Sequence, residues 1–83
     1  MKPRTYQFND ILEVRWIDIV DENSWLTPVR AMHLPACECS SVGYFLNRDE
    51  LVIRISSSVQ VSEADRGVTV IPWGCIIKIT QLK

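Results

Sequence analysis

The chain has little of what sorting signals and familiar catalytic sites are built from. Its 83 residues include only three glycines, three cysteines and one histidine. Gly43, Gly67 and Gly74 are scattered, so the chain has no glycine-rich phosphate-binding loop. An odd number of cysteines in a short chain does not make a disulfide framework. No apolar run approaches the length of a membrane span.

A surplus of positive charge is also missing. The chain has nine Lys and Arg residues and ten Asp and Glu residues, which gives a net charge of -1. The composition therefore lacks the global basic field that attracts nucleic acid, although a local basic rim or a site for a small anion stays open. The N-terminus, Met1-Lys2-Pro3-Arg4, is basic but is not followed by an apolar signal core. We expect a cytoplasmic protein.

Apolar residues are plentiful at 47%, which suffices for the core of one small domain. We expect a flexible N-terminal arm over residues 1–10, whose Tyr6 and Phe8 dock either on the domain or on a neighbouring subunit. Residues 11–83 then form the single domain.

Strand-forming residues dominate that domain. Two β-branched runs flank Pro72-Trp73-Gly74, which predicts two strands joined by a tight turn. Leu12, Val14 and Trp16 alternate with polar residues in the first strand, and the alternation slips after Trp16, which indicates a bulge or coverage of both faces. We expect strands over residues 11–20, 37–46, 51–55 with a continuation towards Val61, 68–71 and 75–82.

The longest irregular segment, residues 21–36, contains one helix signal. Thr27 followed by Pro28 is typical of an N-cap and the first helical position. One or two helical turns over Val29 to Leu34 are expected to end at Pro35. Because so short a helix is marginal alone, we expect Trp25, Val29 and Met32 to anchor it to the domain.

Short connections exclude parallel crossovers, so the sheet is predicted to be antiparallel. The expected fold is all-β with one short helix, a five-stranded small barrel of the Sm-like or SH3-like kind. Gly43 is expected to mark a bend or bulge in the second strand. The predicted core residues are Ile53, Ile55, Val70, Ile71 and Ile77.

Three segments resemble a group of small phage- and prophage-encoded proteins. They are Val14-Arg15-Trp16-Ile17-Asp18, Ser41-Val42-Gly43-Tyr44 and Val70-Ile71-Pro72-Trp73-Gly74-Cys75-Ile76. The resemblance extends over most of the chain from Ile11 to Lys78. It implies a viral accessory protein acting in a bacterial cytoplasm, and the group mostly lacks an assigned activity. The Sm-like signature, a basic residue followed by glycine near the last turn, is replaced here by Pro72-Trp73-Gly74.

The candidates for chemistry are few. His33, Cys37, Cys39 and Cys75 are the residue types that hold zinc, but one residue between Cys37 and Cys39 is too short for a usual zinc knuckle. We expect Cys39 and Cys75 to be small core residues and no metal or cofactor to be bound. His33 is the only histidine, and no pattern orients it towards a nucleophile. An enzyme is therefore the least favoured class, with no catalytic residue assigned.

Binding is the favoured class. Aromatic residues and arginines at the end of the barrel can stack on a ligand or anchor an interface. The turn position of Trp73 predicts an exposed ring that contacts a partner; in the alternative the ring folds back over the barrel end. The predicted binding site is Trp73, Tyr44, Arg48, Arg54 and Arg66.

The expected function is a non-enzymatic binding protein, a phage accessory or anti-defence protein that sequesters a small ligand or occludes a host protein. The alternative is a homo-oligomeric Sm-like RNA-binding protein. A homo-oligomer is also expected because the strand over residues 51–55 and the pair Ile76-Ile77 carry apolar residues on both faces.

Overall fold

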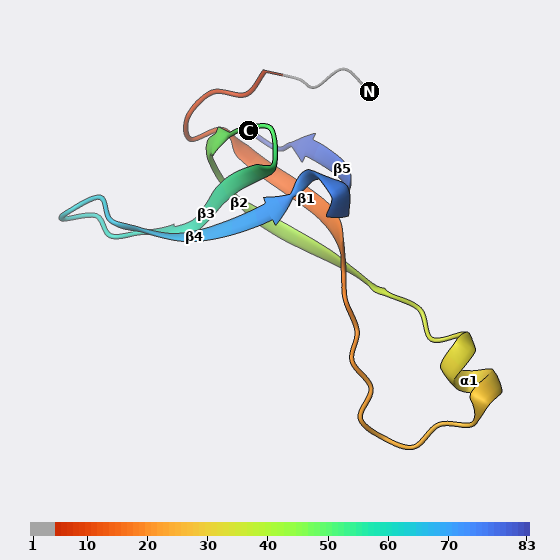
Figure 1. Ribbon diagram of the computed structural model, residues 1–83. Coiled ribbons are helices and arrows are strands. Elements are labelled where there is room, and N and C mark those ends of the chain that lie inside the picture. The colour runs from red at the N-terminus through yellow and green to blue at the C-terminus, as the bar shows by residue number, and fades with distance from the viewer. Residues whose placement is uncertain (1–4) are drawn as a thin grey trace.

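The computed structural model describes residues 5–83 and contains five strands and one α-helix (Figure 1). In chain order these are β1 (Ile11–Asp18), α1 (Pro28–Met32), β2 (Cys37–Arg48), β3 (Val52–Val59), β4 (Arg66–Pro72) and β5 (Ile76–Gln81). A 3-10 turn, Trp73–Cys75, joins β4 to β5. Within residues 5–83, no helix has the length and apolar character that crossing a membrane requires.

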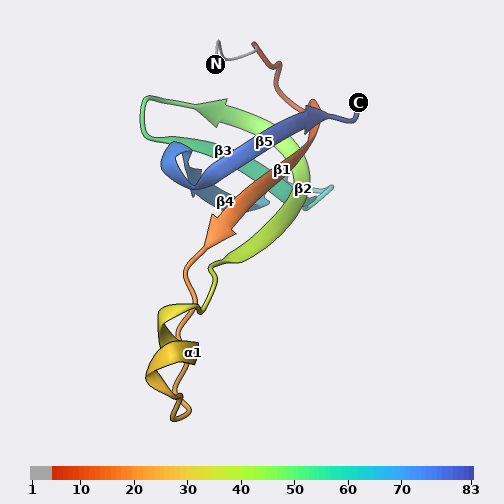
Figure 2. The ribbon, with the colours of Figure 1, turned by 90° about the vertical axis from the view of Figure 1, so that its right-hand side faces the viewer.

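The strands form one antiparallel sheet in the order β4-β3-β2-β1-β5. β1, β2 and β3 each pair with the next strand along the chain, and β5 returns to pair with β1. This confirms the predicted all-β, five-stranded antiparallel fold with one short helix. In Figure 2, β2 curves round one side of the sheet, so the sheet encloses its inner face.

The bend of β2 is possible because Gly43 has no side chain. A Cβ atom at Gly43 would lie 2.7 Å from the backbone oxygen of Ser56 on β3, well inside van der Waals contact. The ladder between β2 and β3 shifts register a little further on, between Phe45 and Asn47. The predicted role of Gly43 in bending the strand thus has a specific cause, the close approach of two backbones.

The core consists of six buried apolar residues from four strands: Leu12, Val14, Phe45, Ile53, Ile55 and Ile71. Of the predicted core residues, Ile53, Ile55 and Ile71 are confirmed. The prediction is wrong for Val70 and Ile77, since 51% and 44% of their surface is exposed. Val70 pairs with Arg54, on the face opposite to the Ile53 and Ile71 pair.

Ile77 is exposed for a different reason. β1 and β5 shift register between Arg15 and Trp16: Arg15 pairs with Lys78 and Trp16 pairs with Ile76. Ile77 is thus the extra residue of a bulge and has no partner on β1. The irregularity expected in the first strand after Trp16 lies instead on β5, opposite Arg15 and Trp16, and β1 pairs with β2 without a shift as far as Asp18.

Residues 19–36 leave the sheet and form a long excursion, here called the projecting arm (Figures 1 and 2). α1 lies near its far end, and Thr27 caps it as predicted, with Oγ1 accepting from the Arg30 amide at 3.3 Å. The predicted anchoring is wrong, because Trp25, Val29 and Met32 are all exposed. No strand among residues 5–83 offers these side chains an apolar surface.

The projecting arm makes the molecule elongated. Its principal extents are 51 × 33 × 22 Å and its radius of gyration is 16.1 Å. A compact domain of this length has a radius of gyration of about 12 Å. The arm therefore lies beyond the compact body that the core stabilises.

The described part of the N-terminal segment follows the sheet. The Asn9 amide donates to the Phe45 carbonyl at 2.8 Å, and the Phe45 amide donates to the Asp10 carbonyl at 2.7 Å. The Tyr6 ring packs on Phe45 with 5.7 Å between centroids. Tyr6 thus docks on its own domain, one of the two expected alternatives. The rest of the predicted arm, residues 1–4, lies outside the described residues.

Candidate functional site

The predicted site residues occupy two separate places. Trp73, Arg54 and Arg48 lie around the turn that connects β2 to β3. Arg66 and Tyr44 lie together elsewhere, beside Phe8. The single rim that the sequence predicted is therefore divided into two clusters.

At the first cluster, Trp73 is half-buried against the core. Its indole Nε1 donates to the Asp49 carbonyl at 2.8 Å, and its backbone amide donates to the Leu51 carbonyl at 3.0 Å. The 3-10 turn directs the ring back over the end of the sheet, so the ring is not the exposed side chain that its Pro-x-Gly setting indicated. This arrangement corresponds to the alternative in which Trp73 closes the barrel end.

Asp49 organises the same turn. One carboxylate oxygen accepts from the amides of Leu51 and Val52 at 2.8 and 3.1 Å, and the other lies 3.0 Å from Arg54 Nη1. The two backbone hydrogen bonds, followed by the bond to Arg54, hold the pKa of Asp49 below its ordinary value. Arg54 Nη1 also donates to Asn47 Oδ1 at 3.1 Å. Arg54 is thus engaged within the chain, and less available to a ligand.

The second cluster, called the Arg66 cluster, consists of Arg66, Phe8 and Tyr44. The guanidinium carbon of Arg66 lies 4.8 Å from the Phe8 ring centroid and 5.8 Å from that of Tyr44. Ring faces attract cations, so the two rings hold the guanidinium in place. Its buried Nη1 has no hydrogen-bond partner among residues 5–83.

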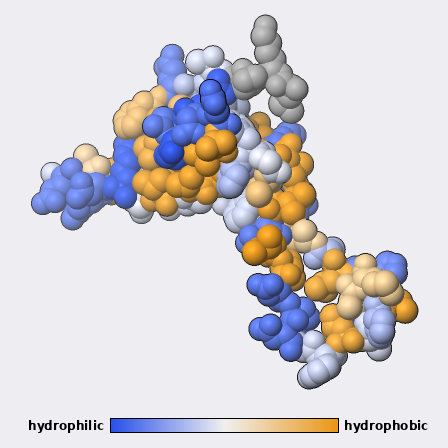
Figure 3. All heavy atoms as spheres, in the orientation of Figure 1, coloured by the Kyte–Doolittle hydropathy of each residue, from blue (hydrophilic) through white to orange (hydrophobic). Residues whose placement is uncertain are grey.

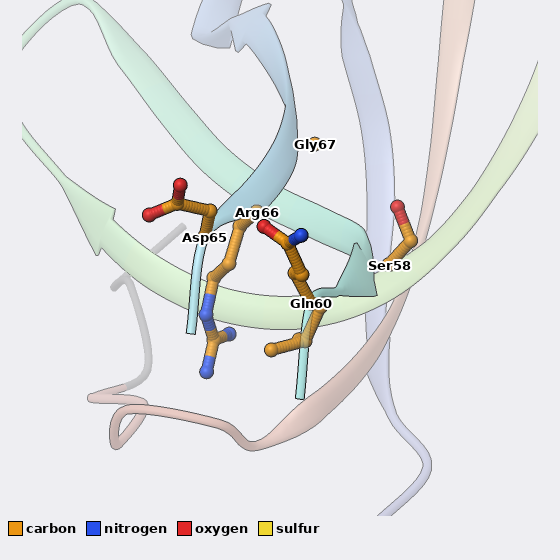
Figure 4. A pocket seen from close by; sticks show the side chains of 6 residues that line it. Ser58, Gln60, Asp65, Arg66 and Gly67 are labelled. Atoms are coloured by element: carbon orange, nitrogen blue, oxygen red, sulfur yellow. The ribbon is translucent and has the colours of Figure 1, made fainter. Parts of the chain in front are cut away.

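An open hollow of about 420 Å³ adjoins Arg66 where the β3–β4 ladder meets its connecting loop (Figure 4). Its lining residues are Ser58, Val59, Gln60, Asp65, Arg66 and Gly67. The hollow is shallow and carries both a cation and the Asp65 carboxylate. The combination suits a small polar ligand better than a polyanion, because Asp65 opposes negative charge.

The four residues considered for zinc do not come together. Among residues 5–83, no group of three or more His, Cys, Asp or Glu side chains is arranged to hold a metal ion. His33 is the exposed C-cap of α1, and its Nδ1 donates to the Val29 carbonyl at 2.8 Å. Cys39 and Cys75 are half-buried rather than buried, which corrects the expectation that both are core residues. Cys37, on the same face as Cys39, is exposed.

The sequence reasoning did not identify the projecting arm as a surface. Figure 3 shows apolar residues gathered on it, far from the body of the molecule. Trp25 is fully exposed at 101%. The other large apolar side chains exposed on the arm are Ile19, Val20, Val29, Met32 and Leu34. The sequence did carry a signal for this surface: the apolar residues of the arm follow neither strand nor helix periodicity. Such residues have no sheet or helix face on which to pack.

Negative charge lies where the arm leaves β1. Asp18, Asp21 and Glu22 are exposed at its start, and Arg30 is its single arginine. The Ser24 amide and hydroxyl both donate to Glu22 and hold the pKa of that carboxyl below its ordinary value. Glu22 is therefore ionised at neutral pH.

The fold and these surfaces define a small all-β protein that carries a projecting, acidic and apolar arm. No family model, curated protein or solved structure matches the chain. The resemblance to small phage proteins and the likeness to Sm-like barrels therefore stay predictions, which the sequence motifs alone support.

Proposed function

We propose that this protein is a non-enzymatic binding protein that occludes a surface of another protein with its projecting arm. The observation that carries the proposal is the complete exposure of Trp25 at the end of an arm that makes no core contact. The predicted setting, a phage accessory or anti-defence protein in a bacterial cytoplasm, is part of the proposal. It rests on the three resembling segments.

Burial energetics support the arm as the contact surface. Burying a tryptophan removes about 150–250 Å² from water. At about 25 cal/mol per Å², that area is worth about 4–6 kcal/mol before the entropy of association is subtracted. Val29 and Met32 lie close to Trp25 in the chain and are exposed too. A protruding tryptophan with aliphatic neighbours has the composition of an interface anchor.

The charge of the arm restricts the partner. Asp18, Asp21 and Glu22 would repel the phosphates of a nucleic acid. They complement a protein surface whose apolar groove is bordered by lysine or arginine. The arm thus favours a host protein as the partner over RNA.

The test compares three forms of the full chain that carry an affinity tag. One is the wild type, the second carries Trp25→Ser with Met32→Ser, and the third carries Val61→Ser. Val61 lies in the β3–β4 connection, is 95% exposed and is a matched control for the removal of an exposed apolar side chain. A bacterial protein retained by the wild type and the control, but lost from the arm variant, is then purified.

Binding of that purified protein is measured by calorimetry and mapped by hydrogen exchange. We expect protection of backbone amides over residues 19–36 and an affinity at least about tenfold lower for the arm variant, as for loss of an interface anchor. Equal affinity of all three forms, or protection confined to the sheet, would overturn the proposal.

Sequestration of a small anionic ligand is the second candidate, and the unpartnered Nη1 of Arg66 favours it. Native mass spectrometry of protein taken from cells tests it, since a retained ligand adds to the subunit mass. Arg66→Lys is the informative variant, because it keeps the charge but loses the planar group held by Phe8 and Tyr44.

The RNA-binding alternative depends on Arg48, Arg54 and Arg66. It predicts an affinity for single-stranded RNA that falls steeply as salt is raised. The pairing of Arg54 with Asp49 weakens this alternative. An affinity for RNA that does not change with salt would exclude it.

A further inference from the structure

Two cysteines meet where β2 begins, at the junction of the sheet and the projecting arm. Cys37 and Cys39 are separated by one residue on a strand, so their side chains point to the same face. Their sulfur atoms lie 3.8 Å apart, and the Cys39 thiol donates to Cys37 Sγ. Cys37 is exposed and Cys39 is half-buried.

We propose that Cys37 and Cys39 form a redox-active dithiol that reduces a low-molecular-weight disulfide, such as glutathione disulfide, and becomes a reversible intramolecular disulfide. This inference is independent of the proposed binding function. It uses neither the apolar residues of the arm nor the Arg66 cluster.

The two thiols have different roles. Cys37 is accessible, and its sulfur accepts the hydrogen bond from Cys39. The Cys37 thiolate attacks one sulfur of the small disulfide, forms a mixed disulfide and releases one thiolate. Partial burial, followed by the hydrogen bond with Cys37, raises the pKa of Cys39. Cys39 is thus the resolving thiol, which reacts in the second step.

In the second step Cys39 loses its proton and attacks Cys37 Sγ. The bond between Cys37 and the small molecule breaks, and the second thiolate leaves. The two protons of the cysteine thiols end on the two small thiols released. The protein is oxidised by two electrons and the small disulfide is reduced by two electrons, so the exchange balances.

Strand geometry makes the product easily reduced. Residues two apart on a strand have Cα atoms about 6.4–6.8 Å apart. Disulfides span Cα separations of about 4.4–6.8 Å, with most near 5.5–6 Å. The strand separation lies at the long end of that range, so we expect closure of the bond to shorten β2 locally, and strained or exposed disulfides are the labile ones.

The surrounding pairs give the reaction a local consequence. Cys39 pairs with Trp16 and Cys37 pairs with Asp18, the last pair of the β1–β2 ladder. Shortening β2 there disturbs the pairs from which the projecting arm departs. Trp16, whose indole Nε1 donates to Ser41 Oγ at 3.0 Å, lies beside the reacting sulfurs and reports on the change.

The geometry favours oxidation over metal binding. Structural zinc takes four ligands, and the described residues bring no third His, Cys, Asp or Glu to the two sulfurs. Cys75, in the 3-10 turn before β5, belongs to a different part of the molecule and is the matched control thiol.

The experiment incubates the full chain in buffers with a graded ratio of reduced to oxidised glutathione, followed by acid quenching and mass spectrometry. The wild type, Cys75→Ser, Cys39→Ser and Cys37→Ser are compared. We expect the wild type and Cys75→Ser to lose two hydrogen atoms and keep no glutathione. Cys39→Ser should stop at a glutathione adduct on Cys37. Cys37→Ser should form an adduct on Cys39 at least about tenfold more slowly, because that thiol is less accessible.

Two further readouts apply to the wild type, so the test does not depend on the folding of any variant. Peptide mapping after alkylation should locate the new bond between Cys37 and Cys39, with Cys75 alkylated. Tryptophan fluorescence should change on oxidation and recover on reduction. A lasting glutathione adduct in the wild type, dimers linked through Cys37, or no loss of hydrogen under fully oxidised glutathione would overturn the proposal.

Discussion

Burial in this protein is decided residue by residue, by the face of the strand on which a side chain falls. Ile53 and Val70 are both apolar residues of adjacent strands, yet Ile53 is fully buried and Val70 is half exposed. Ile53 pairs with Ile71, whereas Val70 pairs with Arg54 on the other face. The two positions therefore give a matched pair for measuring the core.

We expect Ile53→Ala to lower the free energy of unfolding by about 2–5 kcal/mol, because it leaves a cavity in a packed core. Val70→Ala should change it by about 0.5 kcal/mol or less, as exposed sites usually do. Urea unfolding followed by circular dichroism measures both. Equal losses would show that β3 and β4 present other faces to the core.

Trp73 is expected to contribute to stability. Trp73→Ala removes core contacts and the hydrogen bond to the Asp49 carbonyl. The loss should be about 2 kcal/mol, less than the 3–5 kcal/mol typical of a fully buried aromatic ring. Trp25→Ala, at the fully exposed tryptophan, is the control. If thermal unfolding shows no shift for Trp73→Ala while ligand or subunit binding weakens, the ring belongs to a binding site.

Asp49 links stability to pH. Its folded pKa lies below the ordinary value of 3.8, so the ionised carboxylate stabilises the fold above that value. The contribution is lost as pH falls below about 3.8 through the folded pKa, where the carboxylate gains a proton. We expect Asp49→Ala to show a shallower fall of unfolding free energy in this acid range. Parallel curves for the variant and the wild type would show that other groups govern the acid response.

At the scale of the element, the curvature of the sheet depends on β2. Its course past β3 requires a residue without Cβ at Gly43, where all three nearest atoms belong to the Ser56 backbone. Backbone atoms cannot swing aside as the end of a flexible side chain does. β2 is also the strand that carries Cys37 and Cys39 at the foot of the projecting arm.

Gly43→Ala should therefore be strongly unfavourable. We expect a loss of about 1–3 kcal/mol from overpacking, since β2 and β3 must separate. Gly74→Ala is the control, because a Cβ there meets nothing within 4 Å and its φ is not positive. That variant should be neutral or more stable by up to about 1 kcal/mol. Similar melting temperatures for the two variants would show that β2 and β3 do not approach closely at Gly43.

At the scale of the whole molecule, the sheet keeps two open edges, β4 and β5. β3 lies between β2 and β4, so the apolar residues of β3 are not at an edge. Val68 and Val70 on β4 and Ile77 on β5 are about half exposed. Edges with apolar side chains pair readily with other chains.

We expect the chain to form a homo-oligomer through these edges, and light scattering at high micromolar concentration measures it. Val70→Lys should weaken association without lowering the stability of the subunit, because a charge blunts an edge strand. A monomer mass for the wild type across this concentration range would contradict the prediction.

The sequence by itself determined the local features of the protein. Alternation in Leu12, Val14 and Trp16 predicted β1, Thr27 before Pro28 predicted the start of α1, and the turn at residues 72–74 predicted the joint between β4 and β5. These features depend on neighbouring residues, whose dihedral preferences and periodicity are present in any short window.

Only the tertiary structure decided which surfaces meet. The bulge at Ile77, the return of the Trp73 ring over the end of the sheet and the two separate arginine clusters depend on register between strands far apart in the chain. The projecting arm has the same cause. An apolar residue predicts burial only where another element reaches it, and no strand of the described chain reaches Trp25.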